Sequence, residues 1–220
     1  MVRDMNSADE TGREVHWEGV YRTRDPAAVS WFQPVPTPSL ELIRATGAPP
    51  STAIIDVGGG ASSLADHLLA AGYSDVTVLD IAPTALLRTR ERLGPAAGRV
   101  SWIEADITRF VPARQYGLWH DRAVFHFLTD PADRDRYLDA LKAGLADGGH
   151  LILATFGPDG PTRCSGLEVQ RYSAEQLSRV LGPDYRLQQS LLDEHVTPGS
   201  GRQQFLFGWW SYRTDPGGNT

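Results

Sequence analysis

Two short apolar runs separated by three consecutive glycines constrain the fold of this chain most. Residues 53–57 are rich in β-branched side chains, which is typical of a buried strand in a parallel sheet. They lead into Gly58, Gly59 and Gly60, where a side chain would obstruct a ligand that approaches the backbone. A second apolar run at 76–79 ends at Asp80. The pattern predicts two neighbouring strands with a ligand-binding turn after the first.

The segment that follows the glycines predicts a helix over 62–71, with leucines at helical spacing. The free amides at the start of such a helix point toward a ligand in the turn. Asp80 lies 20 residues after Gly60, the distance at which a carboxylate binds a ribose diol in a Rossmann-type unit. A dinucleotide fingerprint requires glycine at position 63, where this chain has Ser63, so NAD is a weaker alternative.

These residues resemble the first motif of the class I S-adenosylmethionine (SAM)-dependent methyltransferases, an acid followed by three alternate glycines. The chain has Asp56-Val-Gly58-Gly-Gly60-Ala-Ser62, with Ser62 at the third glycine. Later family motifs follow in order at 104–107, 116–128 and 148–155. The resemblance implies a Rossmann-like α/β fold with a mostly parallel seven-stranded sheet, an antiparallel last strand and helices on both faces. It also implies SAM as cofactor and S-adenosylhomocysteine (SAH) as product.

The resemblance assigns cofactor contacts residue by residue. Asp80 is expected at the ribose, and Asp106 with Ile107 at the adenine. The full set of expected cofactor residues is Trp17, Tyr21, Trp31, Asp56, Gly58, Gly59, Gly60, Ser62, Asp80, Ile81, Asp106, Ile107 and Asp121.

The aromatic residues before the first strand allow two interpretations. They are either a helix packed across a sheet edge or a cover that shields the sulfonium from water. Their spacing resembles the N-terminal cover of two branches: the thiol and thiopurine methyltransferases, and the elongation-factor and citrate-synthase lysine methyltransferases. We therefore expect residues 13–50 to form an aromatic lid and a helix.

Methyl transfer is an in-line displacement that depends mainly on positioning. Asp121, Arg122, His126 and His195 are the catalytic candidates, because they follow the fourth and sixth expected strands. The thiopurine-type family has a comparable Asp-Arg pair, which favours a small acceptor, with a thiol slightly ahead of an amine or hydroxyl. His126 is either a general base or a buried histidine at a helix start. His120 is expected to be structural.

Beyond the first strands, the pattern predicts strands at 100–104, 185–196 and 203–212, helices at 39–46, 83–93, 134–146 and 173–181, and a long loop at 157–172. The 220 residues read as a single methyltransferase domain, 1–220, with 1–12 and 214–220 expected to be mobile.

Charge and composition limit the kinds of partner and compartment that we expect for this protein. The net charge of −6 without a basic block argues against a nucleic-acid substrate. No apolar run is long enough to span a membrane, one cysteine favours a reducing compartment, and no cluster has metal-ligand spacing. We therefore expect a cytoplasmic monomer or homodimer that uses no metal.

Two functional alternatives stay open. The first is methylation of a protein lysine, with which the negative charge is compatible. The second is a non-catalytic SAM-binding subunit, suggested by Gly117, where the family usually has an acid. The sequence leaves the acceptor and the methylated atom undetermined.

Overall fold

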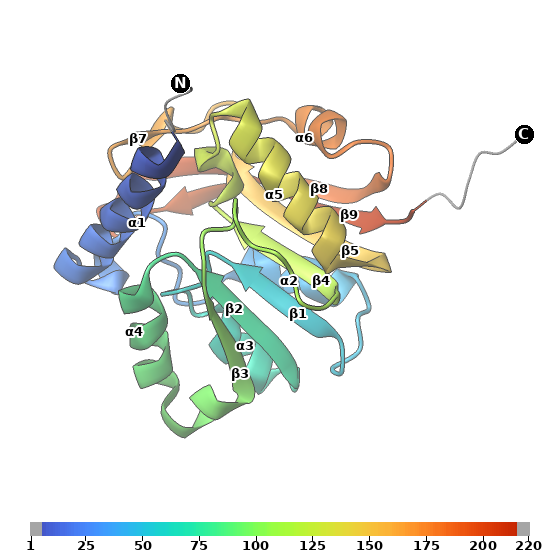
Figure 1. The fold of residues 1–220 in the computed structure, drawn as a ribbon, viewed down its shortest axis with the longest axis horizontal. Coiled ribbons are helices and arrows are strands. Elements are labelled where there is room, and N and C mark those ends of the chain that lie inside the picture. The colour runs from blue at the N-terminus through green and yellow to red at the C-terminus, as the bar shows by residue number, and fades with distance from the viewer. Residues whose placement is uncertain (1–5, 215–220) are drawn as a thin grey trace, which may run out of the picture.

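Seven strands form one sheet in the computed structural model, which describes residues 6–214 (Figure 1). The order across the sheet is β3, β2, β1, β4, β5, β9, β8. Pairing from β3 to β5 is parallel, and β9 runs antiparallel to both β5 and β8. The bounds are β1 Ala53–Val57, β2 Asp75–Asp80, β3 Val100–Glu104, β4 Tyr116–Arg122, β5 Leu145–Phe156, β8 Tyr185–Val196 and β9 Arg202–Tyr212. The predicted fold class is confirmed.

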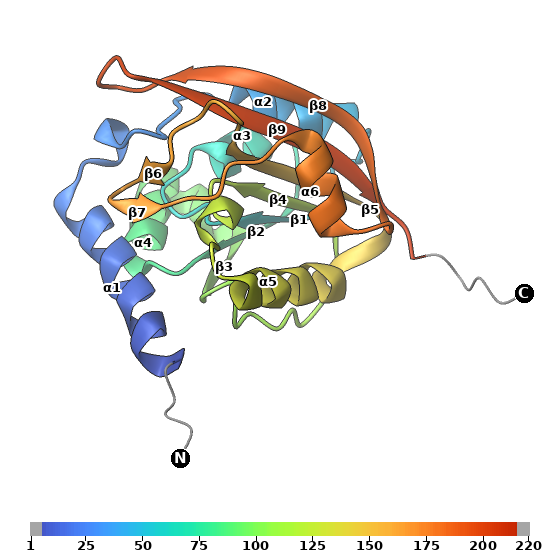
Figure 2. The same cartoon turned by 90° about the horizontal axis from the view of Figure 1, so that it is seen from above.

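Helices cover both faces of the sheet. Apolar side chains of α2, α3 and α4 pack in one core cluster, and those of α5 and α6 pack in another on the opposite face (Figure 2). The central strands are buried on both faces, as expected for a parallel sheet. The bounds are α2 Thr37–Ala45, α3 Leu64–Ala70, α4 Pro83–Leu93, α5 Pro131–Gly144 and α6 Ala174–Leu181, with short 3-10 turns η1 Pro26–Ala28, η2 Gly94–Arg99 and η3 Phe125–Phe127.

Helix α1, Asn6–Thr23, lies along the edge where the parallel strands end (Figures 1 and 2). Residues 6–12, which the sequence indicated to be mobile, belong to this helix. The other residues expected to be mobile, apart from Thr214, lie outside the described part of the chain. The predicted loop 157–172 contains a small hairpin of β6, Arg163–Cys164, and β7, Leu167–Glu168, near α1.

The region after β4 differs from the expected helix. Only the short turn η3 forms there. The carboxylate of Asp121 accepts hydrogen bonds from the backbone N–H groups of Val124 at 2.9 Å and Phe125 at 3.2 Å, and it holds the chain in a tight turn. Ala123 in this turn has φ +72°, a conformation that a side chain disfavours. The turn lies beside the ends of β1 and β5.

Candidate functional site

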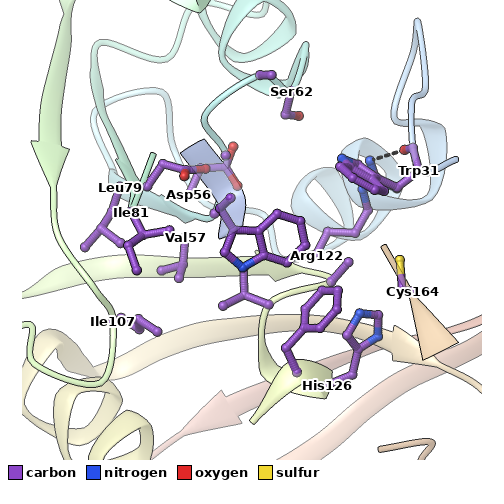
Figure 3. A pocket seen from close by; sticks show the side chains of 18 of the residues that line it. Trp31, Asp56, Val57, Ser62, Leu79, Ile81, Ile107, Arg122, His126 and Cys164 are labelled. Carbon is purple, nitrogen blue, oxygen red and sulfur yellow. Dashed lines mark hydrogen bonds between the residues drawn. The ribbon is translucent and has the colours of Figure 1, made fainter. Parts of the chain in front are cut away.

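A cavity of about 1220 Å³, part of it open to solvent, lies at the carboxyl ends of the parallel strands (Figure 3). This is where ligands bind in open α/β sheets. Most predicted site residues line it. They are Trp17, Tyr21, Trp31, Asp56, Gly58, Gly59, Ser62, Asp80, Ile81, Asp106, Ile107, Arg122 and His126. Gly60, Asp121 and His195 are not among its lining residues.

The glycine turn leaves room for side chains that pack closely against its backbone. Gly58 has φ +68°, and a Cβ there would lie 2.1 Å from Cγ2 of Val124. Gly60 contributes indirectly, because its N–H donates to Oδ2 of Asp80 at 3.0 Å and a Cβ would lie 2.5 Å from that oxygen. Gly60 therefore positions Asp80, which differs from the cofactor contact expected for it. Ser62, at the third glycine position, accepts a hydrogen bond from Leu64 N–H at 3.1 Å and so begins α3.

Asp80 is 4% exposed and both of its oxygens accept backbone hydrogen bonds. The second bond comes from Ala82 N–H at 2.8 Å. Burial raises the pKa of this carboxyl to about 6, and the backbone N–H groups oppose that rise. Each carboxylate oxygen can accept more than one hydrogen bond, so Asp80 still has capacity for hydroxyl groups in the cavity.

Asp56 belongs to a buried hydrogen-bond chain that the sequence did not reveal. Its Oδ1 lies 2.7 Å from Nδ1 of His120, and Nε2 of His120 lies 2.8 Å from Oγ of Ser39. The order of these residues is that of a hydrolase triad, but Ser39 is fully buried and does not line the cavity, so it has no access to a substrate. Oδ2 of Asp56 is buried and has no hydrogen-bond partner among the described residues. His120, expected to be only structural, lines the cavity and orients this carboxylate.

A strand register could have indicated the contact between Asp56 and His120. These two residues are direct partners in the pairing of β1 with β4, and their side chains point to the same face of the sheet. Sequence alone does not identify which strands are neighbours, because β1 and β4 are separated by two other strands in the chain.

Asp106 is held by α1. Its Oδ1 accepts hydrogen bonds from the N–H and hydroxyl groups of Thr108, at 2.9 and 2.8 Å. Its Oδ2 lies 3.2 Å from Nη2 of Arg13, whose Nη1 is 2.8 Å from Oδ2 of Asp133 in α5. Arg13, which sequence reasoning missed, therefore links α1 to the loop after β3 and to α5.

The aromatic side chains before β1 form one cluster with Phe127 of η3. The ring of Trp17 makes edge contacts with Trp31 at 5.9 Å and with Phe127 at 4.9 Å between centroids. Tyr21 lies 6.4 Å from Trp31, and burial raises the pKa of its phenol. All four line the cavity, so α1 and the segment after it cover the site.

The structure places Asp121 behind the cavity, which differs from the catalytic and cofactor contacts expected for it. The carboxylate is fully buried, and in addition to the two backbone N–H groups it accepts a 2.8 Å hydrogen bond from the hydroxyl of Tyr137. Burial raises the pKa of Asp121 to about 6. Asp121 therefore holds the turn that carries Arg122 and His126.

Arg122 extends from the end of β4 into the cavity. Nη2 donates to the backbone oxygen of Trp31 at 2.7 Å (Figure 3), whereas Nη1 is buried without a partner among the described residues. Burial lowers the pKa of the guanidinium to about 10, and Asp56 is the largest influence that raises it. The group therefore stays charged at neutral pH.

His126 is fully buried, and its hydrogen bonding fits the buried histidine of its two predicted roles better than the general base. Its Nδ1 accepts a hydrogen bond from Phe156 N–H at 3.1 Å, so the neutral ring carries its proton on Nε2. Nε2 has no partner among the described residues. Burial, reinforced by the charge of Arg122, lowers the pKa of the ring to about 3, so His126 is neutral and acts as a donor.

His195 has a role outside the cavity. Its Nε2 lies 2.8 Å from the backbone oxygen of Ser30, and the side chain is buried between β8 and the segment before α2. His195 therefore ties the covering segment to the sheet, which differs from the catalytic position expected for it. Burial lowers its pKa.

Within residues 6–214 no group of three or more His, Cys, Asp or Glu side chains is arranged to hold a metal ion. No helix in the same part of the chain is long and apolar enough to cross a bilayer.

Residues 55–151 match a family described as a methyltransferase domain. Nodulation protein S of Rhizobium tropici is 31% identical over 101 residues, which cover 46% of this chain and 42% of that protein. The malonyl-[acyl-carrier protein] O-methyltransferase of Anoxybacillus flavithermus is 32% identical over 111 residues, 50% of this chain and 40% of that protein. The matched part thus spans less than half of either relative.

Solved structures extend the likeness of the fold beyond the matched segment. The N-methyltransferase NodS of Bradyrhizobium japonicum in complex with SAH superposes with a TM-score of 0.67 at 18% identity, covering 91% of this chain and 99% of that one. The structure reported for the conversion of a disulfide bond into a thioacetal group during echinomycin biosynthesis gives a TM-score of 0.67 at 20% identity, covering 90% and 91%.

Proposed function

We propose that this protein transfers the methyl group of SAM to a small-molecule acceptor. The proposal is supported by the match of residues 55–151 to a methyltransferase domain and by the class I fold, both of which the motifs predicted. The observation that carries the proposal is one cavity that joins the glycine turn, the buried carboxylate of Asp80 and the unpartnered Oδ2 of Asp56. The proposal includes that the chain is a single domain, in which residues 13–50 cover the site.

The polar groups of the cavity fit the parts of SAM. Oδ2 of Asp56 is a buried anionic oxygen without a partner, which suits the ammonium group of the methionine end. Asp80 would accept hydrogen bonds from the ribose hydroxyls. Asp106 and the apolar side chain of Ile107 would hold the adenine. Gly58 lines the cavity beside Asp56, where its backbone would lie near the methionine end.

The reaction depends mainly on the positioning of the two reactants and on the exclusion of water. SAM supplies a methyl group bound to a sulfonium, which a nucleophile displaces in line. The aromatic cluster of Trp17, Tyr21, Trp31 and Phe127 keeps water from the reacting atoms, and its ring faces stabilise a cation. Alignment of two bound reactants contributes about 7–11 kcal/mol to such reactions.

The acceptor atom is the finer part of the proposal. A thiol is the first acceptor to test, because the charge of Arg122 favours its thiolate. The relatives argue for a wider panel, since one is an N-methyltransferase and another an O-methyltransferase. A protein lysine is less suited, because Arg122 repels an ammonium group and His126 cannot remove its proton.

An acceptor screen tests the proposal. Purified protein is incubated with SAM and thiols, amines, phenols or carboxylates, and SAH release is measured. We expect release above the acceptor-free rate with at least one class, and loss of that release when Asp80 is replaced by Ala. Stoichiometric SAM binding without turnover on any acceptor would favour the non-catalytic alternative.

A further inference from the structure

Two hydrogen-bond donors of neighbouring cavity-lining side chains have no partner among the described residues. They are Nη1 of Arg122 and Nε2 of His126, and both atoms are buried. Nε of Arg13 is a third such donor, but the guanidinium of Arg13 already pairs with Asp106 and Asp133. A buried donor without an acceptor costs about 1–3 kcal/mol, and more when it is charged. Such groups in a cavity indicate that a ligand supplies the acceptors.

The position of these donors separates them from the expected adenosine site. Figure 3 shows Arg122 and His126 toward one end of the cavity and Ile81 and Ile107 toward the other. Phe156, whose ring is tilted against that of His126 with the centroids 4.6 Å apart, adds an apolar wall at the donor end. The two side chains therefore line the end of the cavity that the acceptor would occupy.

The guanidinium of Arg122 forms no ion pair with a carboxylate of the described residues. No carboxylate of the described side chains lies within ion-pair distance of it, and its one hydrogen bond is to the backbone oxygen of Trp31. A cation held away from water in this way is stabilised when a bound anion reaches it. His126 is neutral, so it adds a donor without adding charge.

We propose that the acceptor of the methyl group is an anion, bound in its ionised form by Arg122 with a hydrogen bond from His126. This inference rests on the proposed methyltransferase function and specifies its substrate class. The carboxylate of Asp121 is the positioning residue for both donors, because it holds the turn between them.

The ionised acceptor makes the chemical step simple. A lone pair of the anion forms a bond to the methyl carbon while the bond from that carbon to sulfur breaks, and the sulfonium becomes the neutral thioether of SAH. An anion and a cation give two neutral groups, and no proton moves. The neutral, hydrogen-bonded state of His126 is consistent with a step that requires no general base from it.

The same donors could instead bind the carboxylate of the methionine part of SAM. The two sources differ in what replacement of Arg122 would do. If the acceptor is the anion, the variant retains its affinity for SAH and loses affinity for a second anion. If the cofactor supplies the carboxylate, the variant loses affinity for SAH but not for 5′-methylthioadenosine, which lacks the amino-acid part.

The test measures binding of benzoate and of its neutral counterpart benzamide to protein saturated with SAH, by calorimetry. We expect benzoate to bind at least tenfold more tightly than benzamide to the wild type. Arg122→Met should abolish that preference and Arg122→Lys should restore part of it. Arg163→Met, at an exposed arginine of the hairpin, is the matched control and should leave the preference unchanged.

Two replacements of His126 distinguish the roles of its two ring nitrogen atoms. Asn has an oxygen near the position of Nδ1 and keeps the bond from Phe156, but lacks the distal donor. Gln has an amide N–H near the position of Nε2. We expect His126→Asn to weaken benzoate binding several-fold and His126→Gln to retain more of it, with circular dichroism confirming that each variant is folded.

The outcomes distinguish this inference from the proposed function. If the wild type does not bind SAH, the methyltransferase proposal itself fails. If SAH binds but benzoate shows no preference over benzamide, or neither probe binds, the anionic acceptor is contradicted while the cofactor site stands. Loss of SAH affinity in Arg122→Met with unchanged binding of 5′-methylthioadenosine assigns the anion to the cofactor and also overturns the inference.

Discussion

Asp80 illustrates at the scale of one residue how burial prepares a carboxylate for a ligand. Its two oxygens are fixed by Gly60 and Ala82, so the side chain has no freedom to lose when it accepts further hydrogen bonds. Burial raises its pKa from 3.8 to about 6. Between these values the native state holds more protons than the unfolded chain, so this contribution to stability falls as pH rises through the interval and is constant above it.

Cofactor affinity should depend on pH in the opposite sense, because ribose hydroxyls donate to the ionised form of Asp80. We expect SAH to bind about tenfold more weakly at pH 5 than at pH 7, since protonation competes one unit below a pKa of about 6. Calorimetry at the two values checks this. In Asp80→Ala the affinity should be at least tenfold lower at pH 7 and independent of pH, whereas Asp159→Ala, at an exposed acid, should behave as wild type. An unchanged affinity in Asp80→Ala would remove this residue from the site.

Asp121 should matter for stability and for the position of its neighbours. Asp121→Ala removes the acceptor of two backbone N–H groups and of the Tyr137 hydroxyl, so we expect a loss of about 2–4 kcal/mol in the free energy of unfolding. Urea denaturation measures it. Tyr137→Phe removes one of these bonds and leaves the indole N–H of Trp119 without its acceptor, but it keeps both backbone bonds, so it should cost less, about 1–2 kcal/mol. Equal losses in both variants would contradict the role assigned to the carboxylate.

Helix α1 is the element that closes the cavity. Arg13 ties it to Asp106 and Asp133, and Glu18 accepts a hydrogen bond from the backbone N–H of Thr84 at 3.1 Å at the start of α4. Both contacts are polar and partly exposed, and they add to the aromatic contacts of Trp17 and Tyr21 with Trp31. A helix that is held at one edge of the molecule in this way can open locally. Opening of α1 would give the cofactor a route into the cavity.

Replacement of Arg13 should loosen this helix. In Arg13→Ala the amides of α1 are expected to exchange with deuterium about fivefold faster, which corresponds to about 1 kcal/mol, and SAH should slow that exchange in the wild type. Arg22→Ala, at an exposed arginine of the same helix, is the control. If both variants exchange alike, Arg13 does not hold the cover.

Elements with strong local signals were predicted well from the sequence. The bounds of β1, β3 and α4 agree with those expected, because each begins or ends at a local signal such as Pro83. The capping box of Ser173 and Gln176 likewise begins α6 where expected. The β6–β7 hairpin was missed, because each of its strands is only two residues long and leaves no periodic pattern in the sequence.

The candidate site shows the same division. The glycine turn and Asp80 follow from a motif, and they line the cavity or build it. Asp121 and His195 end strands at the correct edge, but their side chains turn to buried partners that only the folded structure reveals. Arg13 was missed because its partner Asp133 is 120 residues away.

The whole molecule depends on one sheet that both apolar clusters share. Adjacent residues of β1 and of β5 contribute to opposite clusters, so neither face can unfold without exposing the other. The covering segment joins the same body through the contacts of Arg122 and His195 with the backbone oxygens of Trp31 and Ser30. We therefore expect one cooperative unit.

Urea unfolding should show this unit directly. Circular dichroism and tryptophan fluorescence are expected to report coincident transitions, because Trp119 and Trp210 are in the core while Trp17 and Trp31 are in the cover. SAH at a concentration 100 times its dissociation constant should raise the free energy of unfolding by about 2.7 kcal/mol. A fluorescence change that precedes the loss of secondary structure would mean that the cover unfolds separately.

Titration of the purified protein with SAH in a calorimeter tests the central claim most directly. The account predicts saturable binding of one SAH per chain, because one cavity joins the glycine turn with Asp80 and with the free oxygen of Asp56. The absence of saturable heat with SAH, and equally with SAM, from correctly folded protein would contradict it.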